Sequence, residues 1–480
     1  MSAAAAKFTS PFPPLELSSA DEARLEDMAY FLVQSTVLEY QAYLYKDERV
    51  VDRDQWKFVK RKQKVRVYVE RSAKEMSRRR RKQIEKSESS SSCCLSSEVE
   101  SFSPESTWTS VADASAPAPS EPPVAILGGE AVEINSHRNP RSSLGLPAFL
   151  VAGSVEGTLE DAMYGVLSPT VETMRLKSSY VHDKIVNAAV LATIIVPSVE
   201  TPFRSLSVKW IEKAQPMHLN SLVKNNDVVI LESTGMTCLT NGERIGYVLL
   251  HSVQFPETLP LDSVTRGGLS VCMLFREDTK ATVDVFLIGN VSPVHGVTRR
   301  LFVKSAVEGL ISVWRFVECA RMKKLAWALN QQHSRPIDQI PSDDDPQEDD
   351  SGFDAHTARP SCTHCKRRVG SNSRWQRYFP RRSATRATCK LCSDYVCSTC
   401  KVKQKLSYLA VDPERHVRQR EFTFCALCIH VAVMRTSSQA VATEEAHAMA
   451  RHSAGHKSLI TAWLRGMIDQ PLCRYTQSRS

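Results

Sequence analysis

The feature that most constrains this chain is a set of four CxxC pairs in its C-terminal half. The pairs are separated by 23, 4 and 24 residues, and they are Cys362/Cys365, Cys389/Cys392, Cys397/Cys400 and Cys425/Cys428. A CxxC turn lets two sulfur atoms face one ion at about 2.3 Å, and Zn²⁺ accepts four thiolates in a tetrahedron. The spacing therefore predicts two zinc ions, each enclosed by four protein ligands. Such closed sites leave no position for a catalytic water, so we expect structural zinc.

The remaining sequence argues against an enzyme and against a secreted or membrane-spanning protein. It contains no Gly-rich phosphate loop and no nucleophile elbow. The N-terminus lacks the apolar stretch of a signal peptide, and the most apolar run, Ile185 to Val199, contains Asn187 and Pro197. Without a secretory signal the cysteines stay reduced, which favours metal binding over disulfides. We expect a soluble cytoplasmic protein that reaches membranes, such as those of endosomes, only as a peripheral protein.

The chain has 480 residues, 42% of them hydrophobic and 24% charged, which predicts two or three domains. Residues 1–18 are expected to be a disordered tail. Helical spacing of apolar residues predicts a helix over Ser19 to Tyr45 with Ser19 as N-cap, and alternation predicts a strand over Val65 to Val69. Residues from about 74 to 123 are rich in Arg, Ser and Pro, and we expect a disordered insertion within the first domain.

Short β-branched segments separated by turn residues follow this insertion. They are Val208–Ile211, Val228–Glu232, Ile245–Val253, Ser270–Phe275 and Val283–Ile288. Tight turns between successive strands favour antiparallel pairing. Leu159–Gly165 is expected to be helical, and Thr298–Gln332 to form one long amphipathic helix. A long helix closing a curved antiparallel sheet predicts an α+β fold of the helix-grip type, with a cavity between helix and sheet.

The C-terminal third is expected to contain three further parts. Residues 333–358 are predicted to be an acidic linker, and residues 359–434 to be the zinc unit. Residues 435–480 are predicted to be a tail with one helix, at Glu444–Gln470.

Three passages of the first domain resemble a known family. They are GSVEGTLEDAMYG (Gly153–Gly165), PFRSLSVKW (Pro202–Trp210) and GERIGYVLLHSV (Gly242–Val253). They resemble START-type lipid-binding domains, and the resemblance covers residues 19–332 apart from the insertion. It implies a helix-grip fold with a hydrophobic tunnel for one lipid or sterol, in which an alkyl chain gains about 0.8 kcal/mol per buried CH₂.

Polar and amphipathic residues on or near the strands are candidates for contact with a lipid head group. They are Trp210, Glu232, Arg244, Tyr247, His251 and Arg276. Structural roles are the alternative. Glu232 would then pair with Arg244 across a hairpin or with Arg276 inside the fold, and His251 would lie hydrogen-bonded at the sheet edge.

The order of the cysteine pairs resembles the FYVE-type zinc finger, including the four-residue spacer Ser393–Val396. The resemblance implies that the first and third pairs (Cys362, Cys365, Cys397, Cys400) bind one zinc ion, and that the second and fourth (Cys389, Cys392, Cys425, Cys428) bind the other. Such interleaving gives a cross-braced unit with little apolar core, stabilised by metal. Two independent zinc ribbons are the alternative.

Several residues depart from the phosphoinositide-binding pattern of FYVE fingers. Arg386 and Lys390 remain cationic around the second cysteine pair, but Ala387 and Thr388 occupy the two usual His positions. Ser393 replaces the usual Gly, Thr423 and Phe424 replace the usual Arg-Val, and the opening Trp-x-x-Asp is absent. We therefore do not expect tight, stereospecific binding of one phosphoinositide.

The zinc region is nevertheless strongly basic. Residues 359–420 contain 16 Lys or Arg and 3 Asp or Glu, a net charge of +13. The loop before the second cysteine pair interleaves aromatic and basic residues: Arg374, Trp375, Arg377, Tyr378, Phe379, Arg381 and Arg382. Each Lys or Arg near an anionic membrane contributes about 1 kcal/mol, so the loop is predicted to anchor on such membranes. Alternatively, its aromatic side chains pack on the zinc sites as a miniature core. Nucleic acid is a disfavoured partner, because no recognition helix accompanies the finger.

The sequence thus leads to two functional hypotheses. The first is a non-enzymatic zinc protein that carries one lipid in a START-like pocket and docks on anionic intracellular membranes through a basic FYVE-like finger. The alternative is an interaction scaffold, in which the finger binds a protein partner and the pocket is vestigial.

Overall fold

The computed structural model describes residues 8–91, 147–214, 224–279, 281–292, 299–333, 337–340, 361–367, 388–411 and 416–451. Within these ranges the central element is one large sheet in the order β1-β2-β3-β10-β9-β7-β6-β5-β4, paired antiparallel throughout, with the short β8 parallel to β6 at its side. The strands are β1 (Trp56–Lys62), β2 (Val65–Glu70), β3 (Ala148–Glu156), β4 (Ile185–Ile195), β5 (Ser205–Lys213), β6 (Asn226–Cys238), β7 (Arg244–Ser252), β8 (Thr265–Arg266), β9 (Leu269–Thr279) and β10 (Thr282–Val291).

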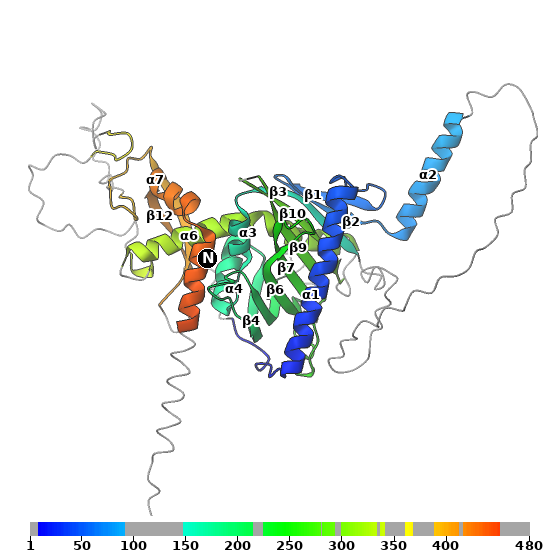
Figure 1. Ribbon diagram of the computed structural model, residues 1–480, viewed down its shortest axis with the longest axis horizontal. Coiled ribbons are helices and arrows are strands. Elements are labelled where there is room, and N and C mark those ends of the chain that lie inside the picture. Colours follow the sequence, from blue (N-terminus) through cyan, green and yellow to red (C-terminus); the bar gives the residue numbers. More distant parts are fainter. Residues whose placement is uncertain are drawn as a thin grey trace, which may run out of the picture.

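Helices cover both faces of this sheet (Figure 1). One face carries α1 (Ser19–Gln41), which continues into the π-helical turn η1 (Ala42–Lys46). The other face carries α3 (Leu159–Val166), α5 (Arg299–Leu310), the 3₁₀ turn η3 (Ile311–Arg315) and α6 (Phe316–Gln332), with α4 (Val171–Val181) beside α6. The predicted α+β helix-grip class is confirmed.

Strand alternation explains how one sheet serves two apolar cores. In β3, Phe149 and Val151 belong to the cluster under α3, α5 and α6, whereas Leu150 belongs to the cluster under α1. We call the first face the helix-layer face and the second the α1 face. Because side chains alternate along a strand, strands buried on both faces read as almost continuous apolar runs, as β4 does over Ile185–Ile195.

Helix α3 lies very close to its neighbours on the helix-layer face. A Cβ atom on Gly165 would overlap the carbonyl oxygen of Phe316, and one on Gly246 of β7 would overlap Met163. Glycine at both positions therefore allows close contact of α3 with α6 and with the sheet.

The C-terminal part of the chain forms a small unit beside α4 and α6. It contains the hairpin β11 (Lys401–Leu409) and β12 (Val417–Cys425), then α7 (Ala426–His430), the π-helical turn η6 (Val431–Arg435) and a helix over residues 438–451. Two further 3₁₀ turns are η2 (Pro256–Thr258) and η4 (Ile337–Gln339). Figure 1 shows α6 running between the sheet and this unit.

Several boundaries differ from the sequence-based expectations. In the part of the expected N-terminal tail that is described, Phe12 and Leu15 are buried, and the Leu15 amide bonds to the carbonyl of Leu191 on β4. The N-cap of α1 is Ser18, which forms a capping box with Asp21, because the chain becomes helical one residue earlier than predicted.

The insertion and the expected long helix also differ. The backbone of α2 is helical over Ala73–Ser91, where disorder was predicted, and the rest of the insertion lies outside the described residues. The long helix predicted over Thr298–Gln332 is interrupted by η3. In the expected linker, Ile337 and Ile340 are buried against the C-terminal unit, and the last helix begins at residue 438 rather than at Glu444.

Candidate metal centre and buried polar network

The eight CxxC cysteines gather into two four-sulfur clusters. Within each cluster all Sγ atoms lie within 4.8 Å of one another, and Cys365 Sγ lies 3.6 Å from Cys397 Sγ. Four sulfur atoms placed about 2.3 Å from one zinc ion form a tetrahedron with edges of about 3.8 Å. The donor set and its spacing therefore fit one tetrahedral metal ion per cluster. The clusters are Cys362, Cys365, Cys397 and Cys400, and Cys389, Cys392, Cys425 and Cys428.

Backbone turns within the CxxC pairs bring the two sulfur atoms of each pair to the same side of the chain. The Lys366 amide donates to the Cys362 carbonyl at 2.9 Å, and the Ser393 amide donates to the Cys389 carbonyl at 2.8 Å. Both turns end in left-handed residues, Lys366 with φ 57° and Ser393 with φ 61°. Glycine adopts this conformation without the steric cost that a Cβ imposes, so Ser393 stands where glycine would be unstrained.

Long-range backbone bonds interleave the two clusters. The Thr363 amide, beside the first pair, donates to the Tyr395 carbonyl at 3.2 Å, just before the third pair. The Lys390 amide, inside the second pair, donates to the Thr423 carbonyl at 3.0 Å, just before the fourth. The first pair thus meets the third and the second meets the fourth. Two independent zinc ribbons, which would join adjacent pairs, are excluded.

The protonation of the thiols is consistent with a metal requirement. Burial raises the pKa of Cys362, but backbone N–H groups of Cys397, Cys365 and His364 outweigh it and lower the pKa to about 6. In the same cluster, hydrogen bonding to the Cys397 and Cys365 sulfur atoms raises the pKa of Cys400 to about 12. Four sulfur atoms this close cannot all ionise without a cation, and a divalent ion makes four thiolates compatible.

The cysteine unit packs directly on the helix-grip domain. Phe422, Phe424 and Leu406 of the hairpin share one apolar cluster with Leu325 and Leu329 of α6. The hydroxyl of Tyr180 on α4 accepts a hydrogen bond from the Ser407 amide at 2.7 Å. His333 Nε2, just after α6, donates to the Lys390 carbonyl at 2.8 Å.

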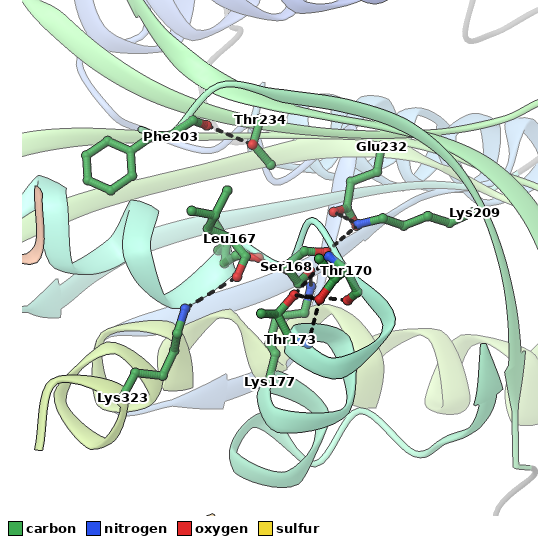
Figure 2. A network of polar contacts seen from close by, with 11 residues as sticks. Leu167, Ser168, Thr170, Thr173, Lys177, Phe203, Lys209, Glu232, Thr234 and Lys323 are labelled. Carbon is green, nitrogen blue, oxygen red and sulfur yellow. Dashed lines mark hydrogen bonds and ion pairs between the residues drawn. The ribbon is translucent and has the colours of Figure 1, made fainter. Parts of the chain in front are cut away.

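Apart from the two sulfur clusters, a cluster of polar side chains lies inside the helix-grip domain, between the sheet and the start of α4 (Figure 2). Lys209 of β5, which is 0% exposed, bonds to the Glu232 carboxylate of β6 and donates to the Ser168 carbonyl at 2.8 Å. Lys177 of α4 donates to the Ser168 hydroxyl at 2.7 Å. Burial would raise the pKa of Glu232, but Lys209 and Lys177 outweigh burial and lower it, so the carboxylate is ionised.

Ser207 extends this cluster along β5. It lies two residues from Lys209, so both side chains point to the helix-layer face. Its hydroxyl is fully buried and has no hydrogen-bond partner among the described residues. The cluster therefore combines an ion pair, a second lysine and an unsatisfied hydroxyl.

Of the six predicted head-group residues, only Glu232 joins this cluster. Four face α1 instead: Trp210 donates to Asp227, His251 bonds Ser270, Arg276 contacts Tyr40, and Tyr247 packs in the α1-face cluster. Arg244 is exposed near Glu160 of α3. The alternative pairings were also wrong, because Glu232 pairs with Lys209, while Arg276 pairs with Glu243, Asp278 and Asp284.

Sequence reasoning missed Lys209, Lys177 and Ser168. Lysine in a strand usually marks a solvent-exposed face, so Lys209 carried no signal of burial by residue type. Its position in the strand did indicate burial. Val208 and Trp210, on either side of Lys209, belong to the α1-face core, so Lys209 must point to the opposite face of the sheet.

The predicted membrane-contact residues lie almost entirely outside the described residues. These are Arg374, Trp375, Arg377, Tyr378, Phe379, Arg381, Arg382 and Arg386. Lys390 is described, and its main chain links the second cysteine pair to Thr423 and His333. In the described ranges, no helix has the length and apolarity needed to cross a bilayer.

Comparison with known proteins gives matches only among solved structures. No protein-family model matches the chain, and no curated protein sequence does. Human StAR-related lipid transfer protein 5 is matched at 11% identity over 62% of this chain and 98% of that one, with a TM-score of 0.35. Human STARD10 is matched at 12% identity over 60% and 80%, with a TM-score of 0.32. A STAR-related lipid transfer protein from Xanthomonas axonopodis is matched at 12% identity over 56% and 99%, with a TM-score of 0.31. The fold assignment rests on the sheet order and helix packing described above.

Proposed function

We propose that this chain is a non-enzymatic protein that binds two zinc ions in its C-terminal unit and one lipid or sterol in its helix-grip domain. The two four-sulfur clusters support the zinc part, because thiolate ligands in tetrahedral spacing favour Zn²⁺ in a reduced compartment. Each ion would have all four positions filled by protein. Such an ion stabilises the fold and has no open position for substrate. The resemblance of the cysteine order to FYVE fingers agrees with this role.

The observation that carries the lipid part is the Ser207–Lys209–Glu232 cluster on the helix-layer face. Ligand sites for apolar molecules combine apolar walls with a few converging polar groups. On the same face of the sheet, Val303, Ala306 and Leu310 of α5 are only partly buried against the apolar cluster, and we expect them to line the apolar part of the site. The 3₁₀ turn η3 separates α5 from α6, and we expect α5 to act as the movable element that closes the site. Ser207 supplies a hydroxyl that a ligand head group would satisfy.

Native mass spectrometry of the full-length protein tests the lipid part. We expect a lipid adduct on protein purified from cells, or uptake from a labelled lipid mixture. Ala306→Trp would place a bulky ring on the partly buried side of α5 and is expected to remove the adduct, whereas Lys304→Trp, on the exposed side of α5, would leave it. The zinc content of the same samples, expected to be two per chain, controls for folding. A folded protein that takes up no lipid would overturn this part.

We further propose that the basic finger docks the protein on anionic membranes. The net charge of +13 over residues 359–420 supports this, since clustered Lys and Arg are attracted to anionic lipid. Full-length protein should sediment with phosphatidylserine vesicles and not with phosphatidylcholine vesicles. Trp375→Ala with Phe379→Ala should release it, while Tyr30→Ala with Phe31→Ala, exposed aromatics of α1, should not. No binding to anionic vesicles would favour the scaffold alternative, with a protein partner for the finger.

A further inference from the structure

A separate cavity lies where the helix-grip domain meets the C-terminal unit. It has a volume of about 630 Å³ and is bounded by α4, α6, β11 and the helix over residues 438–451. That volume is within the range of small-molecule sites. None of Ser207, Lys209 and Glu232 lines it, so it is distinct from the proposed lipid site. We call it the junction cavity, and its main aromatic and polar lining is Tyr180, Trp327, Tyr408, Lys323, His333 and Glu445.

A lysine and a glutamate of the lining meet around one buried tyrosine. Lys323 Nζ lies 3.8 Å from the ring centroid of Tyr164 and donates to the Tyr164 and Leu167 carbonyls at 2.9 and 3.4 Å (Figure 2 labels Lys323 and Leu167). The Tyr164 hydroxyl donates to Glu445 Oε1 at 2.7 Å. Lys323 comes from α6 and Glu445 from the C-terminal helix, so the pair exists only when the two parts are assembled.

Both charged groups keep hydrogen-bonding capacity. An ammonium has three donors, and Lys323 uses two of them among the described residues. A carboxylate oxygen accepts more than one bond, and Glu445 Oε2 has no donor among those residues. One donor and one acceptor of opposite charge thus face a largely apolar cavity whose formal charge is zero.

We propose that the junction cavity binds a neutral, ring-containing apolar molecule with one hydroxyl group. A hydroxyl has both an acceptor and a donor, so one placed between the two groups would accept from Lys323 and donate to Glu445. A carboxylate or phosphate ligand could accept from Lys323 but has no proton to donate to Glu445, and the like charge of Glu445 would repel it. The rings of Tyr180, Trp327 and Tyr408 offer flat apolar faces, which suit a fused ring better than a single alkyl chain.

Pyrenemethanol and pyrenecarboxylate test this assignment, because they share one fused ring and differ in the polar group. We measure their binding to zinc-loaded full-length protein by fluorescence anisotropy. Pyrenemethanol should bind at least about tenfold more tightly than pyrenecarboxylate, given the like charge of Glu445. Glu445→Gln should reverse the preference, because the cavity then carries a net positive charge while the amide oxygen still accepts from Tyr164. Equal affinity of the two probes for the wild-type protein would overturn the proposal.

Two filling variants locate the bound probe. Ala326→Trp would fill the junction cavity and should weaken pyrenemethanol binding by about tenfold or more, while Ala306→Trp under α5 should not change it. The opposite result would place the probe in the helix-grip interior and overturn the junction site, while leaving the proposed lipid function standing. If Ala326→Trp fails to fold, the reversal by Glu445→Gln decides alone.

Discussion

The helix-grip domain and the C-terminal cysteine unit bury their interiors by different means. In the helix-grip domain, two apolar clusters lie on opposite faces of one sheet, and each is completed by helices of the same domain. In the cysteine unit, the buried apolar residues of the hairpin belong to one apolar cluster, which also contains four of the eight cysteines. Residues of α6 complete that cluster. The cysteine unit therefore shares its core with a neighbouring helix and has two sites for the metal that we propose stabilises it, whereas the larger domain supplies its own core.

The shared helix α6 links the two regions. Its Val317 and Ala320 belong to the helix-layer core, while Leu325 and Leu329 belong to the cluster of the cysteine unit. Asp161 of α3, bonded to Lys324 at 2.7 Å and to Ser438 at 2.5 Å, adds a buried polar connection. Four predictions test how far the two regions are separable.

The largest expected effect is that of metal removal. Structural zinc contributes on the order of 10 kcal/mol of apparent folding free energy in small zinc domains. Chelation should therefore abolish amide protection in β11 and β12 and loosen the Leu325–Leu329 end of α6, while β9 and β10 stay protected. Hydrogen exchange detected by mass spectrometry measures this directly.

Matched cysteine variants control that experiment. Cys389→Ser should reproduce the effect of chelation, and Cys238→Ser, an exposed thiol outside both clusters, should have no effect. Protected β11 amides after complete removal of metal would show that the unit does not need zinc to fold.

The next largest effect is expected from disrupting the buried ion pair of Lys209 and Glu232 in the helix-grip domain. Glu232→Leu or Lys209→Met alone should cost about 3 to 5 kcal/mol of unfolding free energy, because each leaves one buried charge unpaired. The double variant should recover most of that loss. Urea unfolding measures all three, and zinc content should not change.

An exposed pair in the cysteine unit gives the comparison for this test. Lys403 and Glu421 pair across β11 and β12 with both side chains largely exposed, and removing both should cost less than about 1 kcal/mol. Single variants of Lys209 and Glu232 that unfold like the wild type would mean that the pair is hydrated in solution.

The pH dependence of stability should reveal the half-buried His251. Burial lowers the pKa of His251 from 6.5 to about 4. Between these values the unfolded chain binds more protons than the folded one, so stability is complete above pH 6.5 and falls as the pH decreases. At pH 5 the loss is about 2 kcal/mol. His251→Asn should remove this share of the acid sensitivity.

Zinc release at low pH would also destabilise the protein, so only the difference between wild type and His251→Asn is informative. Unfolding in urea at pH 7 and pH 5 provides it. Identical pH dependence in both proteins would contradict a neutral, half-buried His251.

The smallest expected effect is an increase in the stability of the cysteine unit. Ser393 is left-handed with φ 61°, and a Cβ in that region costs about 1 to 2 kcal/mol. Ser393→Gly should stabilise the zinc-loaded unit by about 0.5 to 1 kcal/mol after the greater backbone entropy of glycine is subtracted. Resistance to a competing chelator should rise accordingly. Ser398→Gly, at a position without positive φ, should lower it instead, and a gain from both variants would refute the conformational explanation.

Much of the architecture was predictable because its signals are local. The cysteine spacing predicted two four-sulfur sites, and alternation with tight turns predicted an antiparallel sheet with β-strands at the expected segments. Several elements escaped prediction, among them β1, α4 and the hairpin of β11 and β12. Two further cases have a physical reason. β4 packs against an apolar cluster on each face and so lacks alternation. The turn η3 interrupts the apolar pattern of α5 and α6 just after Gly309, a residue that helices often tolerate.

What the sequence alone determined is therefore the chemistry of short spacings: which sulfur atoms share a turn, and which residues alternate along a strand. Only the tertiary structure decided which strand face each helix covers. That choice placed Glu232 with Lys209 and turned Trp210, His251 and Arg276 toward α1. It also decided that the cysteine unit rests on α6 and encloses the junction cavity. A face or an interface is defined by the partner that packs on it, and contacts between distant segments leave no mark in local spacing.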